Sequence, residues 1–471
     1  MKFLKPTLCT ALRLILCLYA ASAVADDARP QLSAEQASAY SYTNVLTAGA
    51  HSWDPLSDKL ATDTALKPDY VVDQSATENG STSFRTLQSC INRIVADTEH
   101  ATGRRRVYIM LKPGTYNELL YLPHLPVALT LYGIGTDPEQ TRIAANLDAT
   151  VTGAAYQQQF EKQFSGVDAQ TRAMVTSVAN RPYIGTDGTA VAWIQDEGFQ
   201  AKNITIQNTY SMPADCLRNG CHEGNSKGSV VHHQAVALML DGADQSQFEQ
   251  VRLLGRQDTL YMKTSARNPL ARSFFDKSYV EGDVDFIFGD ATAYFYQSEI
   301  KSLADRPTSY MAAPSTNYQT QFGFVFNECR FTSDAANDVP HADGKFYLGR
   351  QWFHNQKCTP YAPVNVAGYS CKPGLTDHYS EPTGTISKSV LETVGKVIIM
   401  NSHIGPHIDK QHPWSDWNKV GTLPYRPAQT NSDAYWQNLL NAQIDPIAFM
   451  GYTARKKPVE WFLAEFNNSS D

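Results

Sequence analysis

Pairs of apolar residues separated by four other positions recur along the second half of this chain. Successive pairs begin 49, 27, 20, 31 and 73 residues apart, roughly one to three times a unit of about 20–30 residues, which is typical of solenoids. The pairs are Phe199/Ile204, Phe248/Leu253, Phe275/Val280, Phe295/Ile300, Phe326/Phe331 and Ile399/Ile404. The short runs around them end in Gly, Asn or Asp, as strands do. The pattern therefore predicts an all-β protein built as a parallel β-helix. A β-sandwich or barrel is the alternative, but irregular loop lengths favour the β-helix.

Helical periodicity is scarce, with one clear exception near the start of the repeat. Residues 84–95 carry apolar side chains at Phe84, Leu87, Ile91 and Ile94, which is the spacing of one helix face. A solenoid needs its terminal coil covered, because the last strands would otherwise present an open edge. We therefore expect this helix to cap the N-terminal end of the coil.

Composition indicates one large folded domain. The chain has 471 residues, of which 42% are hydrophobic and 18% charged, so bulk disorder is not expected. We expect a signal peptide over 1–25, an N-terminal extension over 26–80 and a single β-helix domain over 81–471. The net charge of −7 gives no indication of nucleic-acid binding, and we expect a monomer.

The N-terminus has the pattern of a secretory signal. Lys2, Lys5 and Arg13 precede an apolar stretch at 14–25 that ends in small residues. The stretch is too short to span a bilayer, and no other transmembrane segment is expected. The residue before Cys17 is too large for a lipoprotein cleavage site, so soluble export is favoured over lipid anchoring. The predicted location is secreted or periplasmic.

Six of the eight cysteines remain after the predicted signal. Export permits disulfides, and two local pairs are expected, namely Cys216–Cys221 and Cys358–Cys371. Cys90 lies in the predicted helix and Cys329 in a predicted strand, so both are expected to be buried thiols. The spacing of cysteine and histidine gives no zinc pattern, and no metal is expected.

Candidate chemistry begins with an acid inside an apolar strand. Asp285 lies in the run Gly-Asp-Val-Asp-Phe-Ile-Phe-Gly from position 282, where a carboxylate is costly unless it is used or paired. Asp258 lies 27 residues earlier beside Gln257, and Gln234 lies 24 residues before Asp258. Neighbouring coils are about 4.8 Å apart, so the two acids would be close enough to drive their pKa values apart. The two amides could then stabilise an oxyanion.

Strand alternation leaves a second acid to consider. If Val284 and Phe286 point inward, Asp283 and Asp285 both point outward to the groove. Asp283 could therefore compete for the role of Asp285, although a solvated acid at the strand entry is the simpler interpretation. Asp285 itself could instead be a structural partner of a buried arginine.

Four segments in this order resemble one known family. They are Gln234–Leu238, Gln257–Tyr261, Gly282–Gly289 and Leu348–Trp352. Together they are similar to the pectin methylesterases (pectinesterases, carbohydrate esterase family eight). Within that family they most resemble the bacterial branch. Weaker similarity extends from about Phe84 to about Trp417.

The resemblance implies a right-handed parallel β-helix, no cofactor, and hydrolysis of the methyl esters of galacturonate units in pectin. Asp285 matches the nucleophile of the family and Asp258 its acid/base. Gln257 and Gln234 match the residues that stabilise the tetrahedral intermediate, and Arg350 matches the arginine that holds the nucleophile.

Substrate-binding positions are also predicted. Trp352 matches an aromatic residue of the family's cleft. The full predicted set is Trp352, Gln234, Arg350, Thr189 and Phe286. His232 and His233 adjoin Gln234, but a structural role is favoured because the acid pair already accounts for the proton transfers.

The chain departs from the family pattern at several points. Arg256 stands where an aromatic residue is common, and Gln351 replaces the usual proline. Segments 140–182 and 353–382 are insertions, which we expect to form loops or short helices lining the cleft.

Other functions fit the same scaffold. A pectate lyase would need an acid cluster for calcium, and a polygalacturonase would need acids placed to cleave a glycosidic bond. A non-catalytic polysaccharide-binding envelope protein and an esterase or thioesterase for another acyl substrate are the remaining alternatives.

Overall fold

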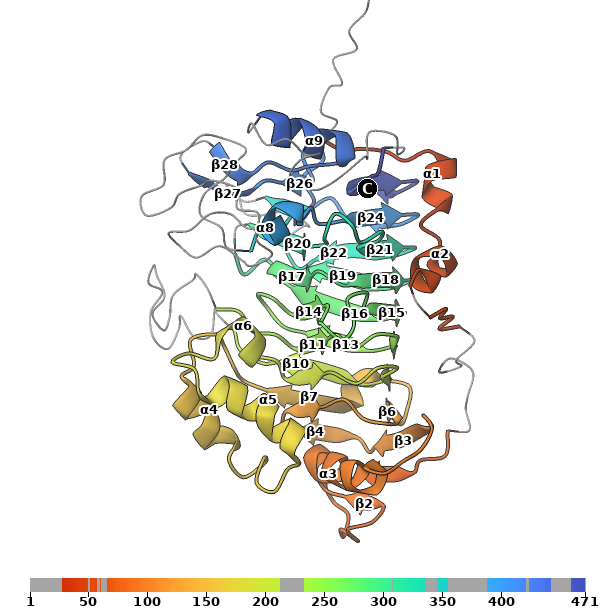
Figure 1. The fold of residues 1–471 in the computed structure, drawn as a ribbon, viewed down its shortest axis with the longest axis vertical. Helices are drawn as coiled ribbons and strands as arrows, with labels where there is room; N and C mark the ends of the chain where they lie inside the picture. The colour runs from red at the N-terminus through yellow and green to blue at the C-terminus, as the bar shows by residue number, and fades with distance from the viewer. Residues whose placement is uncertain are drawn as a thin grey trace, which may run out of the picture.

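The computed structural model describes residues 28–49, 51–56, 60, 66–211, 233–306, 308–335, 345–354, 388–420, 423–441 and 459–470. Over these residues the chain winds into a coil whose strands stack along one axis (Figure 1). The predicted signal peptide, His232 and both predicted disulfides lie outside the described residues. In the part of the chain that is described, no helix is long and apolar enough to cross a bilayer.

Three parallel sheets form the walls of the coil. Sheet A contains, in spatial order, β2 (Ser83–Phe84), β1 (Tyr70–Val72), β3 (Arg106–Leu111), β6 (Ala128–Gly133), β9 (Gln200–Lys202), β12 (Ser246–Glu249), β15 (Arg272–Asp276), β18 (Thr292–Tyr296), β21 (Phe324–Asn327), β24 (Val397–Met400) and β29 (Leu463–Phe466). Sheet B contains β4 (Gly114–Tyr116), β7 (Thr141–Ala145), β10 (Thr205–Asn208), β13 (Arg252–Leu254), β16 (Tyr279–Gly282), β19 (Glu299–Ser302), β22 (Arg330–Ser333), β25 (His403–Ile404) and β30 (Ser469–Ser470). Sheet C contains β5 (Leu120–Leu122), β8 (Ala192–Ile194), β11 (Leu238–Asp241), β14 (Leu260–Lys263), β17 (Val284–Gly289), β20 (Ser309–Pro314), β23 (Phe346–Arg350) and β26 (Trp414–Ser415). The predicted parallel β-helix is confirmed.

Besides the coil, the described residues form several helices and a small two-stranded β-ribbon. The ribbon is antiparallel and joins β27 (Trp417–Val420) to β28 (Leu423–Arg426). The helices are α1 (Ala34–Ser38), α2 (Tyr42–Thr47), α3 (Leu87–Thr98), the 3-10 turn η1 (Pro138–Gln140), α4 (Gly153–Phe160), α5 (Ala169–Ala179), α6 (Gly185–Gly188), α8 (Lys388–Glu392) and α9 (Ser432–Asn441). The first predicted insertion thus begins with a strand, β7, and continues as the helices α4 and α5.

The repeated phenylalanines form a stacked column inside the coil. Phe248, Phe275, Phe295 and Phe326 are in register on successive strands of sheet A, and neighbouring rings stack with centroids 4.6, 4.6 and 4.5 Å apart. Two residues after each ring the backbone takes a left-handed conformation, as at Gln250 with φ 52°. This turn leads the chain from sheet A into sheet B, which explains the five-residue spacing of the apolar pairs.

One predicted pair is out of register. Ala201 aligns with Phe248 and Ile206 aligns with Leu253, so the repeat here is two residues later than Phe199/Ile204. Both predicted residues are nevertheless buried. The left-handed residue of this coil is Asn203, with φ 53°. It stands two residues after Ala201, as Gln250 stands two residues after Phe248, and so identifies Ala201 as the repeat position.

The predicted capping helix is α3, at the N-terminal end of the coil (Figure 1). It begins at Leu87 rather than at Phe84, because the Thr86 side chain caps its first turn and Phe84 belongs to β2. The backbone N–H groups of Leu87 and Gln88 also donate to the buried carboxylate of Glu118. Leu87, Ile91 and Ile94 are buried against the coil, so the predicted apolar face is confirmed.

The segment before the coil crosses the outer side of sheet A. Leu32 donates its backbone N–H to Glu465 O in the last strand of this sheet (2.8 Å). Further along, Arg272 donates to Leu46 O at 2.6 Å and Lys202 donates to Leu60 O at 2.6 Å. The segment then enters the sheet as β1, which pairs with β3. Strand β1 therefore belongs to the coil, although it lies within the predicted 26–80 extension.

Candidate active site

Asp258, two residues before β14, and Asp285, within β17, lie at equivalent positions on adjacent coils. Strands β14 and β17 pair with Leu260 opposite Ile287, and the backbone N–H of Asp258 donates to Val284 O at 3.0 Å. The backbone of both residues is in the left-handed region, with φ 66° at Asp258 and 51° at Asp285. Each residue is 8% exposed. The same left-handed backbone occurs at turns elsewhere in the coil, as at Gln250, and here it places both acids at one point of the wall.

Arg350 clamps Asp285 from the far side. It ends β23, and its Nε and Nη2 donate to Oδ1 and Oδ2 of Asp285 at 2.9 and 2.7 Å. The guanidinium lies 3.9 Å from the ring centre of Tyr310 and 4.4 Å from that of Trp417. Tyr310 is stacked in turn on Tyr347, with ring centres 5.3 Å apart. A two-point ion pair held between rings fixes the orientation of the carboxylate.

Asp258 differs from Asp285 in its electrostatic surroundings. Burial raises the pKa of Asp258 well above its usual value, the negative charge of Asp285 raises it further, and Arg350 opposes both effects. Asp285 has a guanidinium on both of its oxygens, and Asp258 has no such ion pair among those found in the described residues. The site therefore favours the protonated form of Asp258 beside the ion-paired Asp285.

The two glutamines lie on neighbouring coils, one of which carries Asp258. The backbone N–H of Ala235 donates to Gln257 O at 2.9 Å, so the Gln234 and Gln257 segments lie side by side. Gln257 is 8% exposed and its Oε1 accepts a hydrogen bond from Arg306 Nη2 at 3.2 Å. Gln234 is half-buried at the start of the same wall. The backbone thus places Gln257 next to Asp258 and Gln234 on the preceding coil.

Asp283 is not a solvated acid, contrary to the simpler interpretation of the sequence. Its side chain is fully buried, and Oδ2 accepts from Arg306 Nη1 at 2.5 Å while Oδ1 accepts from the Val284 N–H at 2.6 Å. Burial raises the pKa of Asp283, and Arg306 opposes that rise. Asp283 is therefore engaged by Arg306 and does not compete with Asp285.

The predicted substrate-binding residues separate into two groups. Trp352 is half-buried, with its ring centre 6.4 Å from that of Tyr261 and 5.9 Å from that of Phe288, edge-on to both. Thr189 and Phe286 are fully buried. The Thr189 hydroxyl donates to Thr186 O and accepts from the Val236 N–H. Thr189 and Phe286 therefore support the wall from within, which corrects their prediction as substrate contacts.

His233 has the structural role that was predicted. It is fully buried, and its Nδ1 is paired with the Asp148 carboxylate. Its ring stacks on Tyr210, with centroids 5.2 Å apart. Asp148 lies in the insertion between β7 and α4, and Ala149 N–H donates to Gln234 O at 3.0 Å. The histidine thus fastens the insertion beside Gln234.

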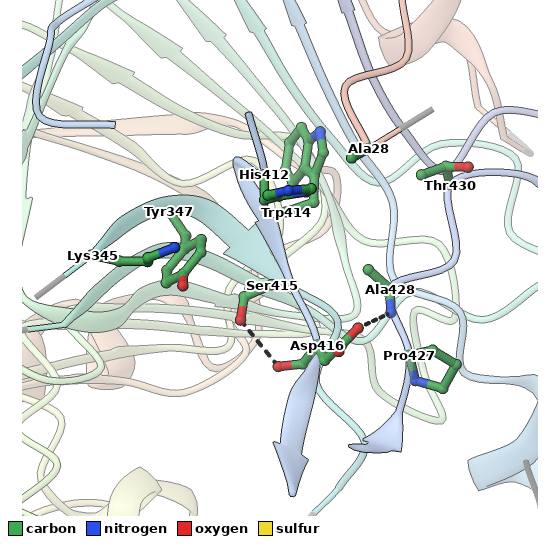
Figure 2. A pocket seen from close by; sticks show the side chains of 10 residues that line it. All are labelled: Ala28, Lys345, Tyr347, His412, Trp414, Ser415, Asp416, Pro427, Ala428 and Thr430. Carbon is green, nitrogen blue, oxygen red and sulfur yellow. Dashed lines mark hydrogen bonds between the residues drawn. The ribbon is translucent and has the colours of Figure 1, made fainter. Parts of the chain in front are cut away.

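A pocket of about 350 Å³ opens at the C-terminal end of sheet C (Figure 2). It is lined by Ala28, Lys345, Tyr347, His412, Trp414, Ser415, Asp416, Pro427, Ala428 and Thr430. Tyr347 and Trp414 lie on β23 and β26, the strands that follow β20 in this sheet. Asp416 accepts from the Ala428 N–H at 2.7 Å, which ties the two walls of the pocket together. Through the stacking of Tyr347 on Tyr310, the pocket adjoins the Arg350 clamp.

Within the described ranges, no group of three or more His, Cys, Asp or Glu side chains is placed to hold a metal ion. Cys90 and Cys329 are free and buried, as predicted. The groups assembled on the wall are therefore two carboxyl groups, two amides and an arginine. A pair of carboxyl groups in different surroundings is an arrangement that can supply both a proton donor and a nucleophile or base.

Comparisons with known proteins identify the family. The family model described as Pectinesterase matches residues 158–359. Pectinesterase B of Dickeya dadantii is 31% identical over 402 residues, which cover 82% of each chain. The solved structure of rice weevil pectin methyl esterase has a TM-score of 0.66 and 26% identity, and the match covers 94% of this chain and 98% of that one. The chain belongs to the pectinesterase family and is a carboxylic ester hydrolase.

A second kind of relative is also present. YbhC of Escherichia coli, whose name provisionally assigns it to acyl-CoA thioester hydrolysis, is 31% identical over 336 residues. The match covers 68% of this chain and 71% of that one. The same scaffold thus carries names that refer to two kinds of acyl substrate.

Proposed function

We propose that this protein hydrolyses the methyl esters of galacturonate units in pectin, giving pectate and methanol. The observation that carries the proposal is the Asp258–Asp285 pair with Arg350 bound to Asp285. One acid is held ionised for attack and the other is kept protonated as a proton donor. The pectinesterase relatives support the choice of a pectin ester as the substrate.

The first half of the reaction uses both acids and both amides. A carboxylate oxygen of Asp285 attacks the ester carbonyl carbon, and negative charge develops on the carbonyl oxygen. The side-chain amides of Gln257 and Gln234 donate to that oxygen. As the tetrahedral intermediate collapses, the bond to the methoxy oxygen breaks, and Asp258 donates its proton so that methanol leaves.

The second half returns the enzyme to its starting state. Asp258, now ionised, takes a proton from a water molecule, and the resulting hydroxide attacks the carbonyl carbon of the acyl-enzyme anhydride. The bond to the Asp285 oxygen breaks, which restores the ionised Asp285 and releases the galacturonic acid group, and that group then loses its proton to solvent. Arg350 holds Asp285 in one orientation during both steps, and Trp352 is proposed to contact the sugar.

Methanol release distinguishes this function from its alternatives. The experiment supplies highly methylated pectin and measures methanol and new reducing ends in the same samples. We expect methanol without new reducing ends, whereas a glycosidase or lyase would shorten the polymer. An acyl-CoA thioester is included because of the relationship to YbhC. If thiol release from the acyl-CoA thioester exceeds methanol release from pectin, the protein is a thioesterase and the proposed function is wrong.

Export by a signal peptide at 1–25, action outside the cytoplasm and a monomeric state all stay predictions. A pectin substrate is consistent with export, because a polymer of this size must be met outside the cell. Sizing the secreted protein and determining its N-terminal residue would test these three predictions together.

A further inference from the structure

We propose that Arg306 is a positioning residue that fixes the amide of Gln257 with its N–H₂ group toward the reacting carbonyl. This inference rests on the proposed function, because it assigns Arg306 a purpose only if Gln257 stabilises the oxyanion. Arg306 lies outside the four family-like motifs, in the turn that follows β19. It acts through Gln257 and is not assigned any contact with the substrate.

The guanidinium of Arg306 bridges two groups at the base of the site. Nη1 donates to Asp283 Oδ2 at 2.5 Å, and Nη2 donates to Gln257 Oε1 at 3.2 Å. The Arg306 side chain is 12% exposed and that of Asp283 is 0% exposed. A buried ion pair of this kind has little freedom to rearrange, so its second arm presents a donor at a fixed place.

This donor decides which end of the Gln257 amide faces the groove. A guanidinium has hydrogen-bond donors and no acceptor, so only the carbonyl oxygen of Gln257 can face it. The N–H₂ group is then directed to the other side of the amide. An amide without such a neighbour could rotate and present its oxygen to the developing oxyanion, which would repel it.

The turn that carries Arg306 is itself fastened on two sides. The backbone N–H of Leu303 donates to Gly282 O at 2.7 Å, and that of Ala304 donates to Asp334 Oδ1 at 2.7 Å. Asp305 forms an ion pair with Arg256. Arg256 precedes Gln257 directly, so its departure from the common aromatic residue supplies a second link between this turn and the Gln257 coil.

Asp283 is held just as firmly from the other side. Its Oδ1 accepts the Val284 N–H at 2.6 Å, and its backbone oxygen accepts from the Ser309 hydroxyl. Asp283 therefore joins the coil that carries Asp285 to the arginine that orients Gln257. The ion pair between Arg306 and Asp283 therefore fixes the Gln257 amide relative to the coil that carries Asp285.

A double-mutant cycle between Arg306 and Gln257 tests the proposal. Arg306→Lys keeps a charge for Asp283 but has no planar fork to serve Asp283 and Gln257 together. We expect kcat for methanol release to fall about tenfold, with KM changed less than about twofold, because only transition-state stabilisation is lost. In a Gln257→Ala background the same change is expected to alter kcat less than about twofold.

Two further variants keep the outcome interpretable. Arg252→Lys changes an arginine that pairs with Glu139 at 3.1 Å on sheet B, and it should leave kcat unchanged in both backgrounds. If Arg306→Lys fails to fold, Asp283→Asn keeps Arg306 and weakens its anchor, and the same dependence on Gln257 is expected. Unfolding temperatures are recorded for every variant.

The possible results distinguish failure of the Arg306 positioning role from failure of the proposed function. Equal losses with and without Gln257, or an unchanged kcat in a folded Arg306→Lys protein, would overturn the positioning role and leave Arg306 with a structural role alone. No methanol release by the wild type would instead overturn the proposed function, and full methanol release by Asp285→Asn would overturn its mechanism. A Gln257→Ala protein with unchanged kcat would overturn the oxyanion role of Gln257 and, with it, the positioning role of Arg306.

Discussion

Arg350 binds both oxygens of Asp285, although 65 positions separate the two residues in the chain. Strand β20 lies between their strands in sheet C, and the ring of its Tyr310 lies 3.9 Å from the guanidinium carbon. The coil thus brings the arginine across one intervening strand to the acid. The ion pair therefore depends on the spacing of successive coils as well as on the two side chains.

Replacing Arg350 by lysine should separate charge from geometry. Arg350→Lys keeps a positive charge near Asp285 but removes the two-point contact. We expect kcat to fall by about 10–100-fold because the nucleophile loses its fixed orientation. Steady-state methanol release measures the effect. Arg330→Lys, on the exposed side of β22, serves as the control and should retain full activity. Wild-type kcat in Arg350→Lys would contradict the account.

The rate should fall on the alkaline side as Asp258 loses its proton. Burial raises the pKa of Asp258, and Asp285 raises it further, so the carboxyl stays protonated to higher pH than an ordinary aspartate. The proposed donor is present below this pKa and is lost as pH rises through it. A profile of kcat against pH should show this fall.

Two variants assign that alkaline fall to a residue. Asp258→Asn should show a residual rate without the fall, because the asparagine has no such proton to lose. Asp276 also has a raised pKa through burial, but it lies on sheet A. Asp276→Asn should therefore keep the wild-type profile. Persistence of the same alkaline fall in Asp258→Asn would reject the assignment.

Asp196 should make the fold less stable as pH rises from about 4 to about 7. Burial raises its pKa from 3.8 to about 7, although Arg104 opposes the rise. Between these values the folded state holds a proton that the unfolded state releases. The stability that this proton provides is therefore fully present below pH 3.8 and is lost as pH rises toward about 7.

The test of Asp196 is a comparison of unfolding free energies across that pH range. Asp196→Asn cannot ionise, so the free energy of unfolding of the wild type minus that of the variant should decrease from pH 4 to 7. Urea unfolding at a series of pH values gives this difference directly. A difference that stays constant or increases with pH would contradict the prediction.

Gln351 should stabilise the fold, although the family usually has proline there. Its side chain is almost fully buried. Its Nε2 donates to Gly395 O at 3.1 Å and Gln429 O at 2.9 Å, and its Oε1 accepts from the Gln429 N–H at 2.8 Å. Gln351→Ala leaves these buried backbone groups without partners.

We expect Gln351→Ala to lower the free energy of unfolding by about 3 kcal/mol, because each orphaned buried group carries its own desolvation cost. Urea unfolding measures the loss, with exposed Gln411→Ala as the control. A loss no larger than that of the control would show that the three hydrogen bonds contribute nothing net.

The coil and its acids could be predicted because they leave a periodic record in the sequence. Phe275 and Phe295 repeat where the winding repeats, and Asp285 interrupts an apolar strand, where a carboxylate is costly unless it is used or paired. The order of the four motifs then assigned Asp258, Gln257 and Arg350. In the structure, Asp258, Gln257, Asp285 and Arg350 come together on one wall.

What the sequence did not reveal depends on turns and on burial. Arg306 lies in a turn without periodicity, so nothing local links it to Asp283 or Gln257. Thr189 is polar, yet both of its hydrogen bonds go to backbone groups under the wall. The shift at Phe199 arose because the left-handed residue, which fixes the repeat, is recognised only from its backbone angle.

The central claim is that ionised Asp285 attacks the ester while protonated Asp258 serves the leaving group. Asp285→Asn keeps the size of the side chain and removes the nucleophile. Methanol release from highly methylated pectin should fall by at least about 10³-fold in this variant, with circular dichroism and the unfolding transition still those of a folded β-helix. Near-normal methanol release from a folded Asp285→Asn protein would contradict the mechanism.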